Sequence, residues 1–479
     1  MLECLFVMSI PSAVASAAEV QTTEDGKFTY TCNYYDETAT IHEYLGEETV
    51  VTFPSEVDGC KVTAISNINT SGVKCVIADP SMKEKITKIV IPDTVKVIAD
   101  GAFRDLTALE TVKMPSKIEE VGGFVFFNCS SLKKISFPST LKKFSGSYMT
   151  GLFGDCTELE EVSFAKNTKI TEIPANTFRG CTSLKKVTLP NKIKRINKCA
   201  FYECNELQTI NFPNTLEVLE EYAFKNCFKL TNIKIGSKIT ELGKSAFANT
   251  GIKKVTIPKN VILKGNVFYG CANLKSAVIS KGVSMGRGEF EDCVKLEKVT
   301  IKSGVTGISN EVFKGTALKT VVIPNTVKYI GSDAFKDCSK LVKVFILGDD
   351  VRMGGFTAGT KVRLYGYKNS TVQTYAKQVG VRFKALTTVK SLKAKNSAKG
   401  KVKLTWKKVS GVKTYTIYRS TSKNGTYKKI GTTKKLSFTD KKAKKGKTYY
   451  YRIVIDYEDS TGVKLTGVKS SSVKIKVKK

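Results

Sequence analysis

Apolar positions along most of the chain recur with a period of about 23 residues, much longer than the period of a single helix or strand. A phenylalanine near the start marks each copy of the phrase A-F-x-x-C-x-x-L-x-x-V-x-I-P-x-x-V-x-x-I, and two clear copies begin at Ala200 and Ala223. The eleven copies are marked by Phe103, Phe126, Phe153, Phe178, Phe201, Phe224, Phe247, Phe268, Phe290, Phe313 and Phe335. A phrase repeated this many times predicts a repeat protein.

The segment L-x-x-V-x-I-P of each copy predicts a short strand, because its Val and Ile positions alternate with polar residues and share one face. Proline cannot donate to a ladder and therefore ends the strand. These prolines are Pro92, Pro115, Pro138, Pro190, Pro213, Pro258 and Pro324. One unit cannot bury its apolar face alone, whereas stacked units form a continuous core. The pattern predicts a β-rich solenoid with a parallel sheet and a buried stack of phenylalanines.

The repeat resembles the BspA-like class of leucine-rich repeats, which occurs in bacterial surface and secreted proteins. The resemblance covers about residues 27–386, where Leu106, Thr250 and Thr316 replace the repeat cysteine. Segments 28–66 and 361–386 resemble the N-terminal cap with its first half-repeat and the C-terminal cap. The resemblance implies adhesion to host matrix proteins or to other cells, although a shared fold does not identify a ligand.

After Leu386 the period disappears and alternating strands of another kind begin, in KVKLTWKKV, KTYTIYRSTSKNGTYKKIG and KTYYYRIVIDY. Residues 387–479 resemble a fibronectin type III β-sandwich. Trp406 matches the core tryptophan of that family, and Tyr449 matches its tyrosine corner. We therefore expect a solenoid with both caps at 18–386 and a β-sandwich at 387–479.

The first residues form a short apolar run that ends in small residues. Ala15-Ser16-Ala17 fits a signal-peptidase site, with cleavage before Ala18, although Glu3 stands where a basic residue is usual. We expect a signal peptide at 1–17 whose true start lies upstream; the alternative is a plain apolar N-terminus. No later segment has about 18 continuous apolar residues, so we expect no membrane span. The expected location is secreted or at the cell surface, associated with the cell wall.

Charge is distributed unevenly along the chain. There are 78 Lys plus Arg and 43 Asp plus Glu, a net charge of +35. Residues 387–479 contain 27 basic and 4 acidic residues, so most of the excess lies in the last fifth of the chain. Such an excess favours anionic partners but does not indicate a fold.

The sequence offers little for catalysis or metal binding. His42 is the lone histidine, which excludes most histidine-based metal sites and makes a catalytic triad improbable. There is no phosphate-binding loop, nucleophile elbow, HExxH motif or convergent carboxylate pair. We expect no enzyme, no catalytic residue, no cofactor and no metal. An accessory module of a carbohydrate-processing system, or an enzyme with an unrecognised site, remains the alternative.

Eight of the 13 cysteines occupy one repeat position, where we interpret them as small buried space fillers. Parallel side chains on adjacent turns do not point at each other as a disulfide requires. These are Cys129, Cys156, Cys181, Cys204, Cys227, Cys271, Cys293 and Cys338. Cys32, Cys60, Cys75 and Cys199 lie elsewhere, and a Cys32–Cys60 bridge in the N-terminal cap stays open.

Two sets of lysines are candidate binding residues. The residues that flank the inward valine of each strand should line the concave sheet, and Glu161 is the one acidic residue of that series. This basic strip comprises Lys113, Lys134, Lys186, Lys234, Lys254, Lys298 and Lys343. The second set, the lysine run, comprises Lys441, Lys442, Lys444 and Lys445. Both sets are also consistent with ordinary solvated surface.

Lysines interleaved with hydroxyl groups suit sulfated, phosphorylated or carboxylated ligands. We expect a monomer that binds extracellular proteins or glycans through the strip and anionic cell-wall polymers through the run. Specific nucleic-acid binding is not expected, since no DNA- or RNA-reading motif is present.

Overall fold

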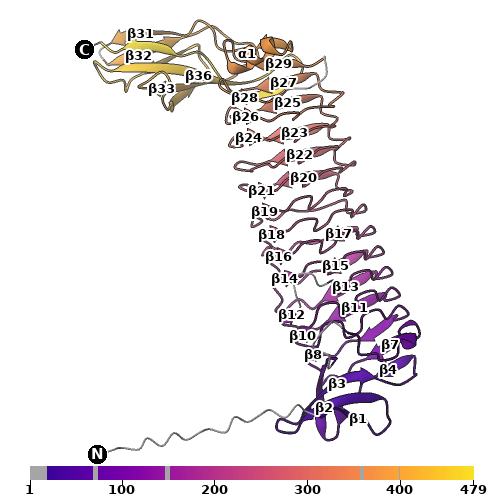
Figure 1. Cartoon of the computed structure of the whole chain (residues 1–479). Coiled ribbons are helices and arrows are strands. Elements are labelled where there is room, and N and C mark those ends of the chain that lie inside the picture. Colours follow the sequence, from indigo (N-terminus) through magenta and orange to yellow (C-terminus); the bar gives the residue numbers. More distant parts are fainter. Residues whose placement is uncertain (1–18, 68–73, 146–150, 356–360, 399, 479) are drawn as a thin grey trace, which may run out of the picture. The chain divides into compact units, whose positions relative to one another are not determined.

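The computed structural model describes residues 19–67, 74–145, 151–355, 361–398 and 400–478. The expected signal peptide at 1–17, and Cys4 with it, lie outside the described residues. The chain divides into two compact units, Met1–Thr215 and Leu216–Lys479, which are described separately. Figure 1 labels their elements. Within the described ranges, no helix combines the length and apolar character needed to cross a membrane.

The first unit begins with an antiparallel cap that leads into parallel turns. Strands β1, β2 and β3 pair antiparallel, and β6, β8, β10 and β12 then add in parallel. Their bounds are β1 Gln21–Thr22, β2 Phe28–Asn33, β3 Thr38–Tyr44, β6 Cys60–Ile65, β8 Val97–Ile98, β10 Glu120–Val121 and β12 Lys143–Phe144. The short β5, Glu56–Val57, pairs antiparallel with β6.

The longer strands of this unit form two further parallel sheets, as the repeat predicts. One is β4 Val50–Thr52, β7 Lys88–Val90 and β9 Thr111–Lys113; the other is β11 Lys134–Phe137, β13 Glu161–Phe164, β15 Lys186–Thr188 and β17 Thr209–Ile210. The strands β7, β9, β11 and β15 end one or two residues before a repeat proline, and β17 ends three residues before one, so the predicted role of proline is confirmed here. The unit also contains η1 Pro80–Glu84, β14 Glu172–Ile173 and β16 Arg195–Ile196.

The second unit continues the same arrangement of parallel turns. Its sheets are β18 Val218–Leu219, β19 Glu241–Leu242 and β21 Ile262–Leu263; β20 Lys254–Ile257, β22 Ser276–Ile279 and β23 Lys298–Ile301; β24 Gly307–Ile308, β26 Tyr329–Ile330 and β28 Arg352–Met353; and β25 Thr320–Ile323, β27 Lys343–Ile346, β29 Arg363–Gly366 and β30 Arg382–Ala385. The two-residue strands form a second parallel sheet that the strand pattern did not predict. Helix α1, Thr371–Gln378, is capped by the Ser370 hydroxyl, which accepts the Gln373 backbone N–H.

The residues after Leu386 form two antiparallel sheets, here called the C-terminal domain. They are β31 Lys393–Ala398, β32 Lys401–Thr405 and β35 Ser437–Asp440, and β34 Lys428–Thr433, β33 Tyr415–Ser420, β36 Thr448–Glu458 and β37 Lys464–Lys469, with β38 Val473–Lys476 also on β36. The buried core of this domain includes Trp406 and Ile453, and is continuous with Phe345, Leu347 and Leu386 of the last solenoid turns. The domain therefore shares its core with the solenoid end of its own unit.

The repeat phenylalanines form the predicted buried stack within each unit. Phe153 lies between Phe126 and Phe178, with ring centroids 5.5 Å from each and nearly parallel planes. In the second unit, Phe247 stacks on Phe224 at 5.5 Å and on Phe268 at 5.7 Å. None of these six side chains is exposed to solvent. Each ring therefore contacts the turn before and the turn after its own.

The repeat cysteines are buried, as predicted, but they also form a hydrogen bond that the pattern did not indicate. Hydrogen bonds of 3.0–3.2 Å to the backbone carbonyl of the phenylalanine one turn earlier are donated by the thiols of Cys129, Cys156, Cys181, Cys204, Cys271, Cys293 and Cys338. Cys156, for example, donates to Phe126. Where threonine replaces cysteine, at Thr250 and Thr316, the hydroxyl donates to the phenylalanine carbonyl of its own turn. Cysteine and threonine at this position thus each give a hydrogen bond to a backbone carbonyl, whereas Leu106 fills the same position without a donor.

The residue before the repeat cysteine has a left-handed backbone conformation. Its φ is +57° at Asn128, +60° at Asp155 and +74° at Gly180. Asn, Asp and Gly tolerate this conformation best, which explains why they recur at that position. The dipeptides Asn-Cys, Asp-Cys and Gly-Cys are therefore turn signals within the repeat.

The cysteines of the N-terminal cap remain thiols. Cys32 and Cys60 are both buried, and no disulfide joins them in the part of the chain that the structure describes. Burial, and next the adjacent Cys60 thiol, raise the pKa of Cys32 to about 12. The bridge that the sequence left open is thus not formed in this structure.

Glu289 is a buried acid at the repeat position that is Ala223 and Ala246 in other turns. Its carboxylate accepts backbone N–H groups from Gly265, Val267 and Gly286 at 2.6–3.1 Å. Burial raises the pKa of Glu289 to about 7, although the three N–H donors oppose the shift. This side chain therefore titrates far from the ordinary range of a glutamate.

Replacing Phe224 by Ala should lower the free energy of unfolding by about 3–5 kcal/mol, since it removes a fully buried ring from the stack. Phe228→Ala is the matched control, because its ring is 54% exposed and its loss should cost no more than about 0.5 kcal/mol. Denaturant melts of both variants measure the difference. Equal losses would contradict the inward assignment.

The stability contributed by Glu289 should depend on pH. Its folded pKa of about 7 exceeds the ordinary value of 4.5, so the folded state holds the proton more tightly and stability falls as pH rises between these values. Relative to Glu289→Gln, the wild type should lose about 3 kcal/mol of unfolding free energy between pH 4 and pH 8. Melts of both proteins at several pH values test this, and a constant difference would show a carboxylate of ordinary pKa.

Candidate functional site

The basic strip of the first unit follows the register of the parallel sheet. Lys134 pairs in register with Glu161, and Glu161 with Lys186. Lys113 occupies the other column of the same face, next to Val90 on β7. The three lysines are exposed. Lys186 also forms an ion pair with Glu161 at 3.4 Å, so it is partly neutralised within the strip.

In the second unit, the strip has a clear register at Lys254, Ser276 and Lys298, which align on β20, β22 and β23. The two lysines are exposed, and so is Lys234, which lies outside the named strands. Thr256 and Thr300 occupy the neighbouring column. This part of the strip therefore alternates ammonium and hydroxyl groups.

Lys343 differs from the other strip residues because the C-terminal domain contacts it. Its ammonium donates to the Thr461 hydroxyl at 2.6 Å and lies 4.0 Å from the Asp459 carboxylate. Two strip positions near it have become apolar or aromatic, at Val322 and Tyr365, and both pack against the core of that domain. The structure thus places Lys343 inside a domain contact, with little of its charge available to a ligand.

The four lysines of the run are exposed in the loop between β35 and β36. Ala443, in the middle of the run, is buried. Asp440, just before the run, accepts from Arg419, from Tyr451 and from the Lys442 backbone N–H. The loop is therefore anchored at its start while its ammonium groups face solvent.

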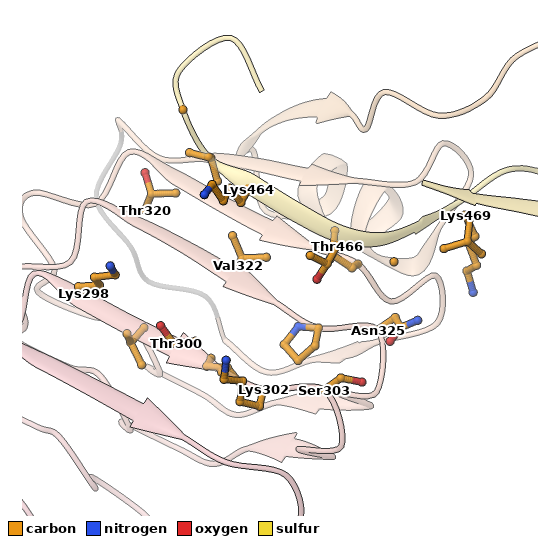
Figure 2. Close-up of a pocket in the computed structure, with 18 of the residues that line it drawn as sticks. Lys298, Thr300, Lys302, Ser303, Thr320, Val322, Asn325, Lys464, Thr466 and Lys469 are labelled. Atoms are coloured by element: carbon orange, nitrogen blue, oxygen red, sulfur yellow. The ribbon is translucent and has the colours of Figure 1, made fainter. Parts of the chain in front are cut away.

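A cleft of about 1000 Å³ lies beside the strip, between the solenoid turns and the C-terminal domain of the second unit. Figure 2 shows residues of β23, β25 and their following loops on one side, and residues of β37 on the other. The solenoid contributes Lys298, Thr300, Lys302, Ser303, Thr320, Val322, Pro324, Asn325 and Leu347, among others. The C-terminal domain contributes Tyr418, Tyr427, Arg452, Val454, Lys464, Thr466 and Lys469, among others. We call this site the junction cleft.

The junction cleft is electropositive. Five cationic side chains line it, and its described lining contains no Asp or Glu. Hydroxyl groups of Thr300, Ser303, Thr320 and Thr466 lie among these cations. In a partly enclosed site such charges are screened less than on open surface. The arrangement is suited to bind an anion.

Of the cationic residues that line the cleft, the sequence predicted Lys298 alone as a site residue. Lys302 follows the strand and was not in the strip series, whereas Arg452, Lys464 and Lys469 belong to strands of the C-terminal domain. The cleft combines residues of β37 with residues of β23 and β25, which lie more than 140 residues earlier in the chain, and no local pattern indicates this. The structure does not bring the lysine run into the lining of this cleft.

His42 has a structural environment. Its ring is buried, Nδ1 lies 2.7 Å from the Ser66 carbonyl, and Nε2 lies 2.9 Å from the Thr31 hydroxyl. A proton on Nδ1 satisfies both contacts, with the hydroxyl donating to Nε2. Among the residues in the described ranges, no group of three or more His, Cys, Asp or Glu side chains could hold a metal ion.

Comparisons with known proteins agree with the repeat. The BspA type leucine rich repeat region matches residues 81–170, 149–275 and 262–352, more than half of the chain. No curated protein matches the sequence.

Solved structures of bacterial leucine-rich repeat proteins are also similar. A leucine-rich repeat protein from Bacteroides ovatus is 24% identical, with a TM-score of 0.57, covering 75% of this chain and 98% of its own. A leucine rich cell surface protein from Faecalibacterium prausnitzii is 23% identical, with a TM-score of 0.43 and coverages of 78% and 96%. The pneumococcal vaccine antigen PcpA is 15% identical, with a TM-score of 0.41 and coverages of 77% and 99%.

The similarity to the Bacteroides ovatus structure supports the solenoid fold alone. The family match spans the turns that contain the buried phenylalanine stack and the parallel strands. This chain belongs to the BspA-type leucine-rich repeat family.

Proposed function

We propose that this protein is a non-catalytic binding and adhesion protein that acts outside the bacterial cell, secreted or associated with the cell wall. The observation that carries the proposal is the exposed face of the parallel sheet, where Lys254 and Lys298 align in register among hydroxyl groups. An extended face of this kind offers a large area for a protein or a polymeric glycan. Its charge favours acidic ligands.

The family supports this proposal, since proteins with these repeats are generally non-enzymatic binding proteins of bacterial surfaces or secretions. One solved relative, from Faecalibacterium prausnitzii, is itself described as a cell surface protein. For this chain, the surface location and the monomeric state are part of the proposal.

The C-terminal domain is proposed to be a fibronectin type III-like β-sandwich that binds anionic cell-wall polymers through the lysine run. Its three-stranded and larger antiparallel sheets support the assignment. So does the contact of Trp406 with Tyr415, whose ring centroids are 5.4 Å apart. The Tyr449 hydroxyl accepts the Lys444 backbone N–H at 3.3 Å, a bond of the kind that defines a tyrosine corner.

The shared core of the C-terminal domain and the last solenoid turns determines how this proposal is tested. A cut at Leu386 would expose Phe345 and Leu347, so variants of the full chain are preferable to fragments. Changing Lys441, Lys442, Lys444 and Lys445 to Gln removes the run. Changing Lys113, Lys134, Lys186 and Lys254 to Gln removes the same number of charges from the strip.

The run variant should elute from immobilised heparin at clearly lower salt than the wild type, and the strip variant at intermediate salt. Exposed charges act over about 8 Å at physiological ionic strength, so clustered lysines contribute more than spaced ones. Salt-gradient elution of the three proteins decides the order. A larger decrease in elution salt for the strip variant would show that the main polyanion site lies on the solenoid. A wild-type protein that is not retained by heparin would refute polyanion binding altogether.

The location has its own test. Expressed in a Gram-positive host, the protein should appear in the medium or the wall fraction, with an N-terminus at or near Ala18. Cell fractionation followed by N-terminal sequencing measures both. A cytosolic protein that retains Met1 would contradict the surface location.

A further inference from the structure

We propose that the junction cleft is a discrete binding site for an anionic oligosaccharide, with Arg452 as the residue that engages a sulfate or carboxylate group. The inference rests on the proposed function, because it assigns a specific site and a ligand class to a protein proposed to bind acidic extracellular ligands. It differs from the lysine run in kind: the run attracts by charge density, whereas the cleft holds its cations at set positions.

The first support is the unbalanced charge of the cleft. Lys469 forms an ion pair with Asp349 at 2.8 Å, so its charge is compensated. The other four cations, Lys298, Lys302, Arg452 and Lys464, have no ion-pair partner within the described residues. Burial alone would raise the pKa of Asp349, but Lys469 and, more weakly, Arg452 hold it below its ordinary value. Asp349 thus balances part of the charge and leaves most of it unmatched.

The second support is the setting of Arg452. Its guanidinium carbon lies over the Tyr427 ring, 4.4 Å from the ring centre, where the aromatic face attracts the cation. Its Nε is buried and lacks a hydrogen-bond partner among the described residues. A guanidinium oriented by an aromatic ring and free of a carboxylate is prepared to form a forked contact with an oxyanion.

The composition of the cleft favours a glycan over an acidic peptide. Thr300, Thr320 and Thr466 offer hydroxyl groups that can bond to sugar hydroxyls, and Lys298 links the cleft to the open strip. A peptide would be expected to pair with the edge strand β37. Gly467 interrupts that strand with a φ of +77°, which distorts the free edge of β37 and disfavours regular pairing along it.

The test measures binding of a heparin-derived tetrasaccharide to the full chain by calorimetry at an ionic strength of about 0.15 M. The wild type should bind one tetrasaccharide, and Arg452→Gln should lose about tenfold or more in affinity, because a desolvated charge contact is removed. Arg452→Lys should recover only part of the loss, since lysine keeps the charge without the fork. The lysine-run variant is the matched control and should bind within about twofold of the wild type.

Two further ligands identify the chemistry. An oligogalacturonate of the same length carries carboxylates without sulfate, and binding of either glycan that depends on Arg452 supports the proposal. A hexaglutamate peptide that binds as tightly as the tetrasaccharide, with the same dependence on Arg452, would overturn the glycan assignment. Should Arg452→Gln fail to fold, the exposed Lys464→Gln replaces it, with an expected loss of about threefold.

Unchanged binding by the cleft variant, or loss of binding by the run variant, would refute a cleft site. So would wild type that does not bind the tetrasaccharide. Retention of the same proteins on long-chain heparin distinguishes failure of the cleft proposal from failure of the proposed function. If only the cleft proposal is wrong, the proteins are still retained on long-chain heparin. If long heparin is not retained either, the proposed function itself is wrong.

Discussion

A turn of about 23 residues has an apolar face too large for itself to cover, and the organisation of this protein follows from that constraint. Each phenylalanine ring is covered by the rings of adjacent turns, and each repeat thiol donates to the carbonyl of the turn before it. Each turn is therefore stabilised mainly by its contacts with the neighbouring turns of the chain. The parallel register that results also places every strip residue, since a strand cannot shift without uncovering its valine.

Local repetition explains which features could be predicted from the sequence. The buried phenylalanines, the prolines that end strands and the two columns of the strip each depend on residues within one repeat. A consensus hides departures from it, so Glu289 in an alanine position was overlooked. The two-residue strands have too little pattern to be recognised. Arg452 and Lys298 line the same cleft only because the C-terminal domain packs against the solenoid, and no sequence period predicts that packing.

The two sets of cations in this protein illustrate different ways to meet an anion. The lysine run gathers ammonium groups in four of five successive positions, so the sequence alone shows it. The junction cleft brings cations from three separate stretches of chain and adds an aromatic ring that orients one of them. The contact between the C-terminal domain and the solenoid also removes one cation from the binding surface. Lys343 contacts Thr461 and Asp459 of that domain, so its charge is not available to a ligand.

The burial of the repeat thiols has a consequence for their chemical reactivity. Oxidation and alkylation need the thiolate, and burial raises the pKa of Cys129 and Cys156 well above that of an ordinary thiol. These cysteines are thus protected by the packing itself and need no reductant. A thiol of this kind reacts only when its own turn unfolds locally. The rate at which a thiol reagent modifies each cysteine therefore measures how often that turn of the solenoid opens.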